Sequence, residues 1–201
     1  MIRVLLVHDS CLMRSALTAL LGREHDLEVS ESSWRAAVGQ VRSLQPHVCI
    51  VDVECPGAAM LGSLIGRLRR ATGSAAALLV LATGTRPGLL RRAFDAGALG
   101  YVSKDAGPQR LLDGIRQVAA GERFVDESLA FGFLQAAEMP LTSRELSVLR
   151  MAAEGATIAE IARGLHLSHG TVRNYMSAIT RKTGARNRVD AIRISQHAGW
   201  V

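Results

Sequence analysis

Long apolar runs, aromatic residues and lysines are all scarce in this chain of 201 residues. No apolar run reaches the roughly 18 residues that a membrane-spanning helix needs. The opening MIRVLLVHDS is apolar too briefly for a signal peptide. Aromatic residues make up 4% of the chain, so its core must rest on Leu, Val, Ile and Ala. We therefore expect no membrane partner and a cytoplasmic location.

Cysteine and lysine are informative because they are rare. Cys11, Cys49 and Cys55 are an odd number without the spacing of a metal site, and they suit a reducing compartment. Of 24 basic residues only two are lysines, Lys104 and Lys182. Where arginine is the default, a lysine indicates that its position requires a compact point charge. Both lysines are therefore candidate functional residues.

The composition is that of a globular protein, with 48% hydrophobic and 21% charged residues, and it excludes a wholly disordered chain. The net charge of +6 is unevenly placed: residues 1–120 carry +4, residues 121–140 carry −3 and residues 141–201 carry +5. A small basic segment at the end of the chain suggests a polyanion such as nucleic acid. On charge alone, an ordinary solvated surface explains it equally well.

The first 120 residues alternate short apolar runs with amphipathic segments, which predicts a parallel sheet of five strands with helices on both faces. The expected strands are 2–7, 27–30, 48–53, 77–82 and 100–103, and the expected helices are 11–22, 33–44, 59–71, 87–97 and 107–120. Ligands of such sheets bind beyond the carboxyl ends of the strands. Polar residues fall at those ends: His8, Asp9, Ser10, Asp52, Thr83, Ser103 and Lys104.

The pattern changes at about residue 121. The acidic stretch 121–140 contains a possible linking helix over 126–137, and no strand-like alternation follows Pro140. Residues 141–201 predict four helices, at about 143–153, 157–165, 169–182 and 188–198. A tight turn at His166 and Leu167 joins the second to the third, which is rich in Arg, Asn and Thr. That arrangement is typical of a helix-turn-helix.

Several segments are similar to one protein family, in the family's order: VLLVHDSCLMRSAL, PHVCIVDVECPG, LLVLAT, GALGYVSKDA and LTSRELSVLRMAAEGATIAEIARGLHLSHGTVRNYMSAITRKTGARNR. The chain resembles a bacterial two-component response regulator of the NarL/FixJ type. The resemblance implies a flavodoxin-like α/β receiver domain at 1–120, a linker at 121–140 and a small all-α LuxR-type helix-turn-helix domain at 141–201. It implies a transcription regulator rather than an enzyme, with a sensor histidine kinase as a possible partner.

The same resemblance assigns the phosphoryl chemistry. It makes Asp52 the phosphoacceptor, Asp9 a direct Mg²⁺ ligand and Lys104 the contact of the phosphoryl group. Transfer to a carboxylate needs this nucleophile, a divalent cation with oxygen ligands and a cation for the developing charge. Glu54 is a further candidate metal ligand, the alternative being an exposed loop glutamate. A turn aspartate at 52 and a surface lysine at 104 are the corresponding plain alternatives.

Two positions depart from the family pattern. His8 stands where the family usually has the first of two acids, so we expect weak Mg²⁺ binding. Ala82 stands at the switch position, where the family has Ser or Thr. Thr83 follows, but on a continuing strand its side chain points to the opposite face unless a bulge intervenes. Tyr101, at the usual aromatic switch position, is then expected to serve in packing.

The third helix of the C-terminal part has two faces. Val172, Ile179 and either Tyr175 or Met176 recur at helical spacing and are expected to face the core. Arginine and asparagine read guanine and adenine edges, and hydroxyls and free amides at a helix start meet phosphates. By resemblance, Lys182 contacts backbone phosphate. The expected contacts with double-stranded DNA are Ser168, Thr171, Arg173, Asn174, Ser177, Arg181 and Lys182, and the family implies a homodimer on paired half-sites.

Other hypotheses stay open at this point. One is a DNA-binding regulator with an atypical receiver, controlled by constitutive dimerisation, a small ligand or a partner protein, as His8 and Ala82 suggest. A second is a hydrolase with Asp52 as nucleophile, because Asp52-Val53-Glu54 is loosely similar to the Asp-x-Asp of haloacid-dehalogenase phosphatases. A third is a pure interaction module. Cys55, beside the predicted site, adds a redox-sensing hypothesis against that of an inert thiol.

Overall fold

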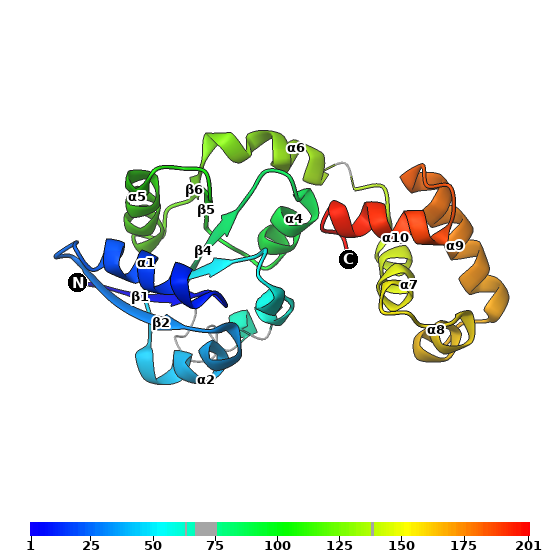
Figure 1. Ribbon diagram of the computed structural model, residues 1–201, viewed down its shortest axis with the longest axis horizontal. Helices are drawn as coiled ribbons and strands as arrows, with labels where there is room; N and C mark the ends of the chain where they lie inside the picture. Colours follow the sequence, from blue (N-terminus) through cyan, green and yellow to red (C-terminus); the bar gives the residue numbers. More distant parts are fainter. Residues whose placement is uncertain (63, 67–75, 138) are drawn as a thin grey trace. The chain divides into compact units, whose positions relative to one another are not determined.

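A computed structural model describes residues 1–62, 64–66, 76–137 and 139–201 of the protein (Figure 1). The chain divides into two compact units. The N-terminal unit comprises Met1–Gly84 and Leu90–Phe133, and the C-terminal unit comprises Thr85–Leu89 and Leu134–Val201.

The N-terminal unit is built on a parallel sheet. Its strands pair in the order β2-β1-β3-β4-β5-β6, which is the flavodoxin-like order with one strand added at the β5 edge. The bounds are β1 (Ile2–Val7), β2 (Leu27–Ser32), β3 (Val48–Asp52), β4 (Ala77–Ala82), β5 (Gly100–Ser103) and β6 (Phe124–Val125). The five expected strands are confirmed. The sixth was missed because two residues are too few to show a strand period.

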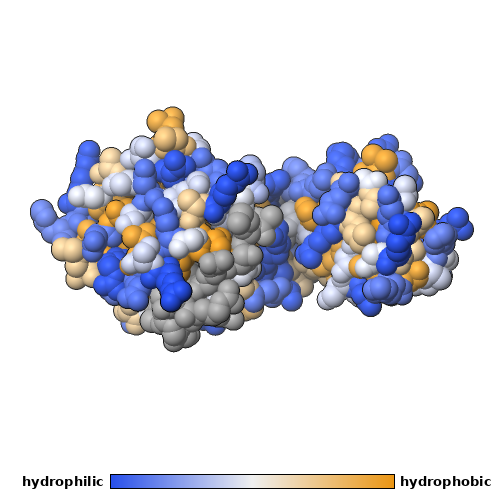
Figure 2. Space-filling model, turned by 90° about the horizontal axis from the view of Figure 1, so that it is seen from below, coloured by the Kyte–Doolittle hydropathy of each residue, from blue (hydrophilic) through white to orange (hydrophobic). Residues whose placement is uncertain are grey.

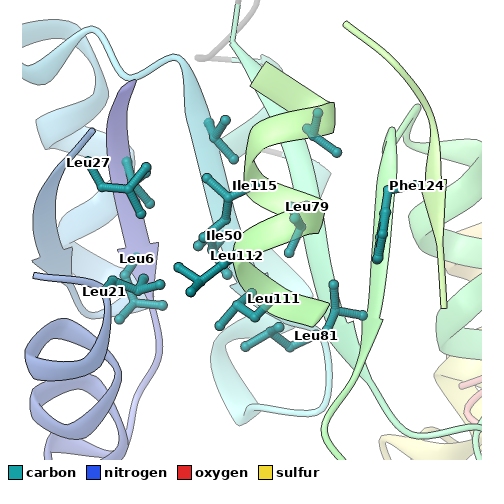
Figure 3. Packing of buried hydrophobic residues seen from close by; sticks show 14 residues of the cluster. Leu6, Leu21, Leu27, Ile50, Leu79, Leu81, Leu111, Leu112, Ile115 and Phe124 are labelled. Carbon is teal, nitrogen blue, oxygen red and sulfur yellow. The ribbon is translucent and has the colours of Figure 1, made fainter. Parts of the chain in front are cut away.

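Alternating side chains bury both faces of the sheet. Helices α1 (Cys11–Leu21), α2 (Trp34–Leu44), α4 (Pro87–Asp95) and α5 (Pro108–Ala119) follow the expected positions, and the expected helix 59–71 lies partly outside the described residues. On one face, Ile50 and Leu79 pack beneath Ile115 of α5 (Figure 3). The alternate residues Leu5 and Val80 are equally buried, so the second face is covered as well.

The connector begins with β6 and continues as η2 (Glu127–Leu129) and α6 (Ala130–Ala137). The predicted linking helix over 126–137 is therefore observed as an α-helix from residue 130 to 137, preceded by a short 3-10 helix. On the face drawn in Figure 2, hydrophilic residues predominate and hydrophobic residues form separate patches. In the described ranges no helix is both long and apolar enough to cross a membrane.

The C-terminal unit contains the four predicted helices, and their ends follow from local capping. They are α7 (Ser143–Ala153), α8 (Ile158–Leu165), α9 (His169–Thr183) and α10 (Arg188–His197). Thr142 and Thr157 each form a capping box, with Glu145 and Glu160 respectively. Ser168 caps α9, and His166 takes the left-handed conformation that makes the tight turn before it.

Candidate functional site

The polar residues at the carboxyl ends of β1, β3 and β5 converge on one carboxylate. Asp52 is the last residue of β3 and is 2% exposed. Its Oδ2 atom lies 3.1 Å from Nε2 of His8 and 2.9 Å from Nζ of Lys104. Its Oδ1 atom accepts a hydrogen bond of 2.8 Å from the backbone N–H of Glu54. Both oxygens of this buried carboxylate therefore have donors, as burial requires.

Lys104 forms ion pairs with two carboxylates. Its ammonium lies 3.1 Å from Oε2 of Glu54 in addition to its contact with Asp52. Partial burial lowers the pKa of Lys104, but the hydrogen bonds and charges of Asp52 and Glu54 outweigh burial and raise it. Lys104 is therefore a fixed positive charge beside Asp52, as the stabilisation of a phosphoryl group on that residue would need.

His8 is fixed on both sides of its ring. Its Nδ1 atom accepts a 3.0 Å hydrogen bond from the backbone N–H of Ser10. In the neutral ring the proton is then on Nε2, which donates it to Oδ2 of Asp52. The side chain of Arg14 binds the carbonyl oxygen of His8 at 2.8 Å. An N–H donor therefore stands where the usual acid would offer an acceptor to a cation.

Glu54 and Thr83 form a second part of the site. Strand β4 ends at Ala82, so the side chain of Thr83 is not governed by strand alternation. Its hydroxyl donates a 2.6 Å hydrogen bond to Oε1 of Glu54, and its backbone N–H donates one of 2.7 Å. The expectation that Thr83 faces away held only for a continuing strand, and it does not apply because β4 ends one residue earlier.

The interpretation of Glu54 as an exposed loop residue was also wrong. Its side chain is 15% exposed and holds Thr83 and Lys104. Burial raises the pKa of Glu54, but hydrogen bonds from Thr83 and Lys104 lower it by more, so it lies below the usual range. Glu54 is thus an ionised link between the ends of β4 and β5.

Candidate metal ligands are only partly assembled. Ligand atoms of His8, Asp52 and Cys55 lie within 4.8 Å of one another. Asp9 is exposed, and its Oδ2 atom accepts a 2.9 Å hydrogen bond from the N–H of Gly57. Magnesium prefers oxygen ligands, and of these residues only Asp9 and Asp52 supply carboxylates. Burial raises the pKa of the Cys55 thiol, which weakens it as a nucleophile.

Tyr101 packs inside the N-terminal unit. It is 3% exposed, and its hydroxyl donates a 3.4 Å hydrogen bond to the carbonyl of Ala98. Its ring meets that of Phe133 edge-on, with centroids 4.9 Å apart, and burial raises the pKa of Tyr101 to about 12. Ala82 is likewise buried. These contacts agree with a packing role for Tyr101.

Helix α9 presents a polar face opposite its buried one. Val172, Met176 and Ile179 are buried in the core of the C-terminal unit, and Tyr175 is partly buried against it. The side chain of Ser168 accepts a 3.1 Å hydrogen bond from the N–H of Thr171, which fixes the start of the helix. The exposed polar residues of the helix include Arg173, Asn174, Ser177 and Arg181.

Lys182 has a partner that sequence reasoning missed. Its Nζ atom lies 2.8 Å from Oε2 of Glu145, which is 4% exposed and completes the capping box of α7. The pairing joins the ends of α7 and α9. The spacing Thr142-x-x-Glu145 was the available signal, because a capping-box glutamate is also an acceptor for a nearby cation. The predicted phosphate contact of Lys182 stays a prediction.

Comparison with known proteins covers both units. The model of the response regulator receiver domain matches residues 4–116, and that of the bacterial regulatory proteins of the luxR family matches residues 139–195. Response regulator RamR of Streptomyces coelicolor is 54% identical over 203 residues, covering 100% of this chain and 98% of that protein. Transcriptional regulatory protein DesR of Bacillus subtilis is 38% identical over 202 residues, covering 100% and 99%.

Solved structures share the fold. Response regulator ChrA of a heme-sensing two-component system has a TM-score of 0.58 at 26% identity, covering 100% of this chain and 98% of that one. The complex of the two-component response regulator RcsB with DNA has a TM-score of 0.64 at 23% identity, covering 98% of each chain. The protein therefore belongs to the response regulators that join a receiver domain to a LuxR-type helix-turn-helix domain, a family of transcription regulators.

Proposed function

We propose that this regulator acts in the cytoplasm, where phosphorylation of Asp52 promotes a homodimer that binds double-stranded DNA. The observation that carries the proposal is the buried Asp52 carboxylate 2.9 Å from Lys104, at the carboxyl ends of β3 and β5, the two parallel strands on either side of β4. The donor would be a sensor histidine kinase or acetyl phosphate. An Asp52 oxygen would attack phosphorus, the bond to the leaving group would break, and Lys104 would neutralise charge on the phosphoryl oxygens.

Receiver domains generally bind Mg²⁺ at the phosphorylation site. Here we propose Asp9 and Asp52 as its ligands, with charge neutralisation as its contribution. Glu54 stays a predicted ligand, but it would have to release Thr83 or Lys104 to reach the ion. Because His8 offers an N–H in place of a carboxylate, we expect weaker binding than in a receiver with two acids.

The proposed DNA contacts divide by chemistry. Arg173 and Asn174, exposed on α9, would read base edges through bidentate hydrogen bonds. Ser168 and Thr171, at the helix start, would meet phosphate. Ser177, Arg181 and Lys182 complete the proposed surface. The known complex of RcsB with DNA is consistent with this use of the domain.

A second candidate is a regulator with the same DNA-binding role but a receiver that does not depend on phosphorylation. Two observations favour it: His8 already donates to Asp52, and the buried Ala82 has no hydroxyl to offer at the switch position. Its dimers would form constitutively or under the control of a ligand or partner protein.

Incubation with acetyl phosphate and Mg²⁺, followed by intact-mass measurement, tests the first proposal. We expect an adduct of about 80 Da that Asp52→Asn abolishes, with a parallel rise in dimer mass and DNA affinity. DNA binding should weaken steeply with salt, because phosphate contacts release counterions. An unmodified wild-type protein that still dimerises and binds DNA would contradict phospho-activation and support the second candidate.

A further inference from the structure

A cavity of about 400 Å³ opens beside Asp52 in the N-terminal unit. It extends from the polar ends of β1, β3 and β5 to the space between α1 and α5. Cavities of roughly 300–1,000 Å³ with mainly apolar walls and a few polar groups are typical of small-molecule sites. This one meets both conditions, and a phosphoryl group on Asp52 has no use for its apolar part.

The apolar wall comes from both helices and from the sheet. Helix α1 supplies Met13, Leu17 and Leu20, and Leu81 and Leu111 line the opposite side. Figure 3 shows Leu81 and Leu111 beside each other at the start of α5. Met13 is 45% exposed, and the flexible side chain of a methionine adapts to different shapes. Water in such a space finds few hydrogen-bond partners, so an apolar molecule displaces it at a gain.

The loop before α5 leaves room for an occupant. Ala106 and Gly107 both line the cavity. A Cβ atom built on Gly107 would meet no atom of the described structure within 4 Å. Because Gly107 is exposed, this part of the wall borders solvent and leaves an entrance to the cavity.

The charged groups at the polar end of the cavity favour a neutral ligand over an anion or a cation. Asp52 accepts from His8, Lys104 and the N–H of Glu54, so its oxygens are already satisfied. An anion would meet the carboxylates of Asp52 and Asp105, which line the cavity, while the charge of Lys104 is already shared with Asp52 and Glu54. A cation would compete with that lysine for the same carboxylates. A neutral molecule avoids both penalties.

Lys104 supplies the point of recognition. An ammonium has three N–H donors, and among the described residues Asp52 and Glu54 are its acceptors. The third donor is available to an acceptor atom placed at the polar end of the cavity. A carbonyl oxygen is a suitable partner for this donor, because a carbonyl accepts a hydrogen bond from a cation and carries no charge of its own.

We propose that the cavity between α1 and α5 binds a small neutral molecule with an apolar body and one carbonyl acceptor, which receives a hydrogen bond from Lys104. This inference goes beyond the proposed function, because binding needs no phosphorylation of Asp52. The same lysine would serve the ligand and a phosphoryl group, so occupancy of the cavity would compete with phosphorylation.

The neutral aromatic ketone prodan is a suitable probe, because its emission moves to shorter wavelength in apolar surroundings. Titration of the full chain should give a saturable blue shift. Ala106→Phe, which fills the cavity, should weaken binding at least tenfold, and Lys104→Met several-fold. Ala120→Phe is the matched control, because Ala120 is exposed and outside the cavity, and it should bind as the wild type does.

Two outcomes would overturn the proposal: the absence of saturable binding by the wild type, or equal binding by Ala106→Phe and wild type, which would place the probe elsewhere on the surface. If Ala106→Phe fails to fold, amide chemical shifts of the wild type decide the question. Shifts confined to the residues that line the cavity support the site, and shifts elsewhere or none reject it. Prodan binding by the unphosphorylated wild type separates this inference from phospho-activation, because the site needs no phosphoryl group on Asp52.

Discussion

Each unit contains one of the two lysines, and each lysine pairs with a nearly buried carboxylate. Lys104 lies 2.9 Å from Asp52 in the receiver domain, and Lys182 lies 2.8 Å from Glu145 in the helix-turn-helix domain. Both lysine side chains remain about one-third exposed, at 32% and 33%. The two pairs are alike in chemistry and burial, so their difference must come from what surrounds them.

The surroundings assign different roles to the two pairs. Glu145 also accepts from the backbone N–H and the hydroxyl of Thr142, so its carboxylate is tied to the start of a helix. Asp52 lies at a strand end beside a cavity, and two of its three donors are side chains. A lysine–carboxylate pair is therefore structural where it closes a cap and available for chemistry where it faces a cavity.

The largest difference between the two pairs is expected when each carboxylate is removed in turn and the loss of unfolding free energy is compared. Glu145→Ala removes a cap and an ion pair together, and we expect a loss of about 2 kcal/mol in the unfolding free energy of its domain. Asp52→Asn should cost less than half as much, because asparagine keeps an acceptor and relieves repulsion with Glu54. Urea denaturation measures both, with Trp200 reporting on the C-terminal unit and Trp34 on the N-terminal one. Equal losses would remove the distinction.

Substitution of Arg173 should change DNA binding by the C-terminal unit without changing its stability. Arg173→Ala should lose about 1.5 kcal/mol of discrimination between a specific and a mutated DNA site, because it would remove the bidentate contact to guanine that we propose for this residue. Its unfolding free energy should stay within about 0.5 kcal/mol of wild type, because the residue is exposed. Competition binding with the two DNAs measures the discrimination. An unchanged ratio would move base reading to other residues of α9.

Lowering the pH should destabilise the C-terminal unit through the Glu145–Lys182 pair. Burial raises the pKa of Glu145, but hydrogen bonds from Lys182 and Thr142 outweigh it, so the pKa lies below its ordinary value of 4.5. Its stabilising contribution is then complete above about pH 4.5 and is lost as the pH falls through the folded pKa. Between pH 6 and pH 3.5, the free energy of unfolding should decrease less steeply in Glu145→Gln than in the wild type. Parallel curves would show that the carboxylate is not the titrating group.

The smallest loss of unfolding free energy is expected for an ion pair that neither caps a helix nor faces the cavity. Arg91 lies 3.1 Å from Asp95 one helical turn away, with both side chains well exposed. Arg91→Ala should change the unfolding free energy by less than about 0.5 kcal/mol, as exposed pairs do. The same urea titration provides the measurement. A loss as large as that of Glu145→Ala would show that surroundings do not decide the value of these pairs.

The strands and helix caps could be predicted from sequence because their signals are local. Runs such as Val48–Asp52 are apolar and end in a polar residue, and Thr142, Thr157 and Ser168 are standard caps. The polar face of α9 followed from helical spacing for the same reason. None of these predictions required knowledge of which segments meet in space.

The rest of the site depended on contacts between distant segments. Thr83 and Glu54 are 29 residues apart, and their hydrogen bond follows from the point where β4 ends, which strand alternation does not reveal. The cavity depends on how far α1 stands from α5, and no residue of either helix encodes that distance alone. The partnership of Lys182 with Glu145 spans 37 residues and needed the packing of α7 on α9.

The short strand β6 has a practical consequence for dividing the chain. Phe124 and Val125 pair with Gly100 and Tyr101 along the edge of β5. A receiver fragment cut at residue 120 would leave that edge with bare N–H and C=O groups, which invite pairing with another molecule and aggregation. A fragment that ends after Phe133 keeps the edge covered and retains the ring that packs on Tyr101. The acidic connector is thus, in its first part, a protective border of the receiver sheet.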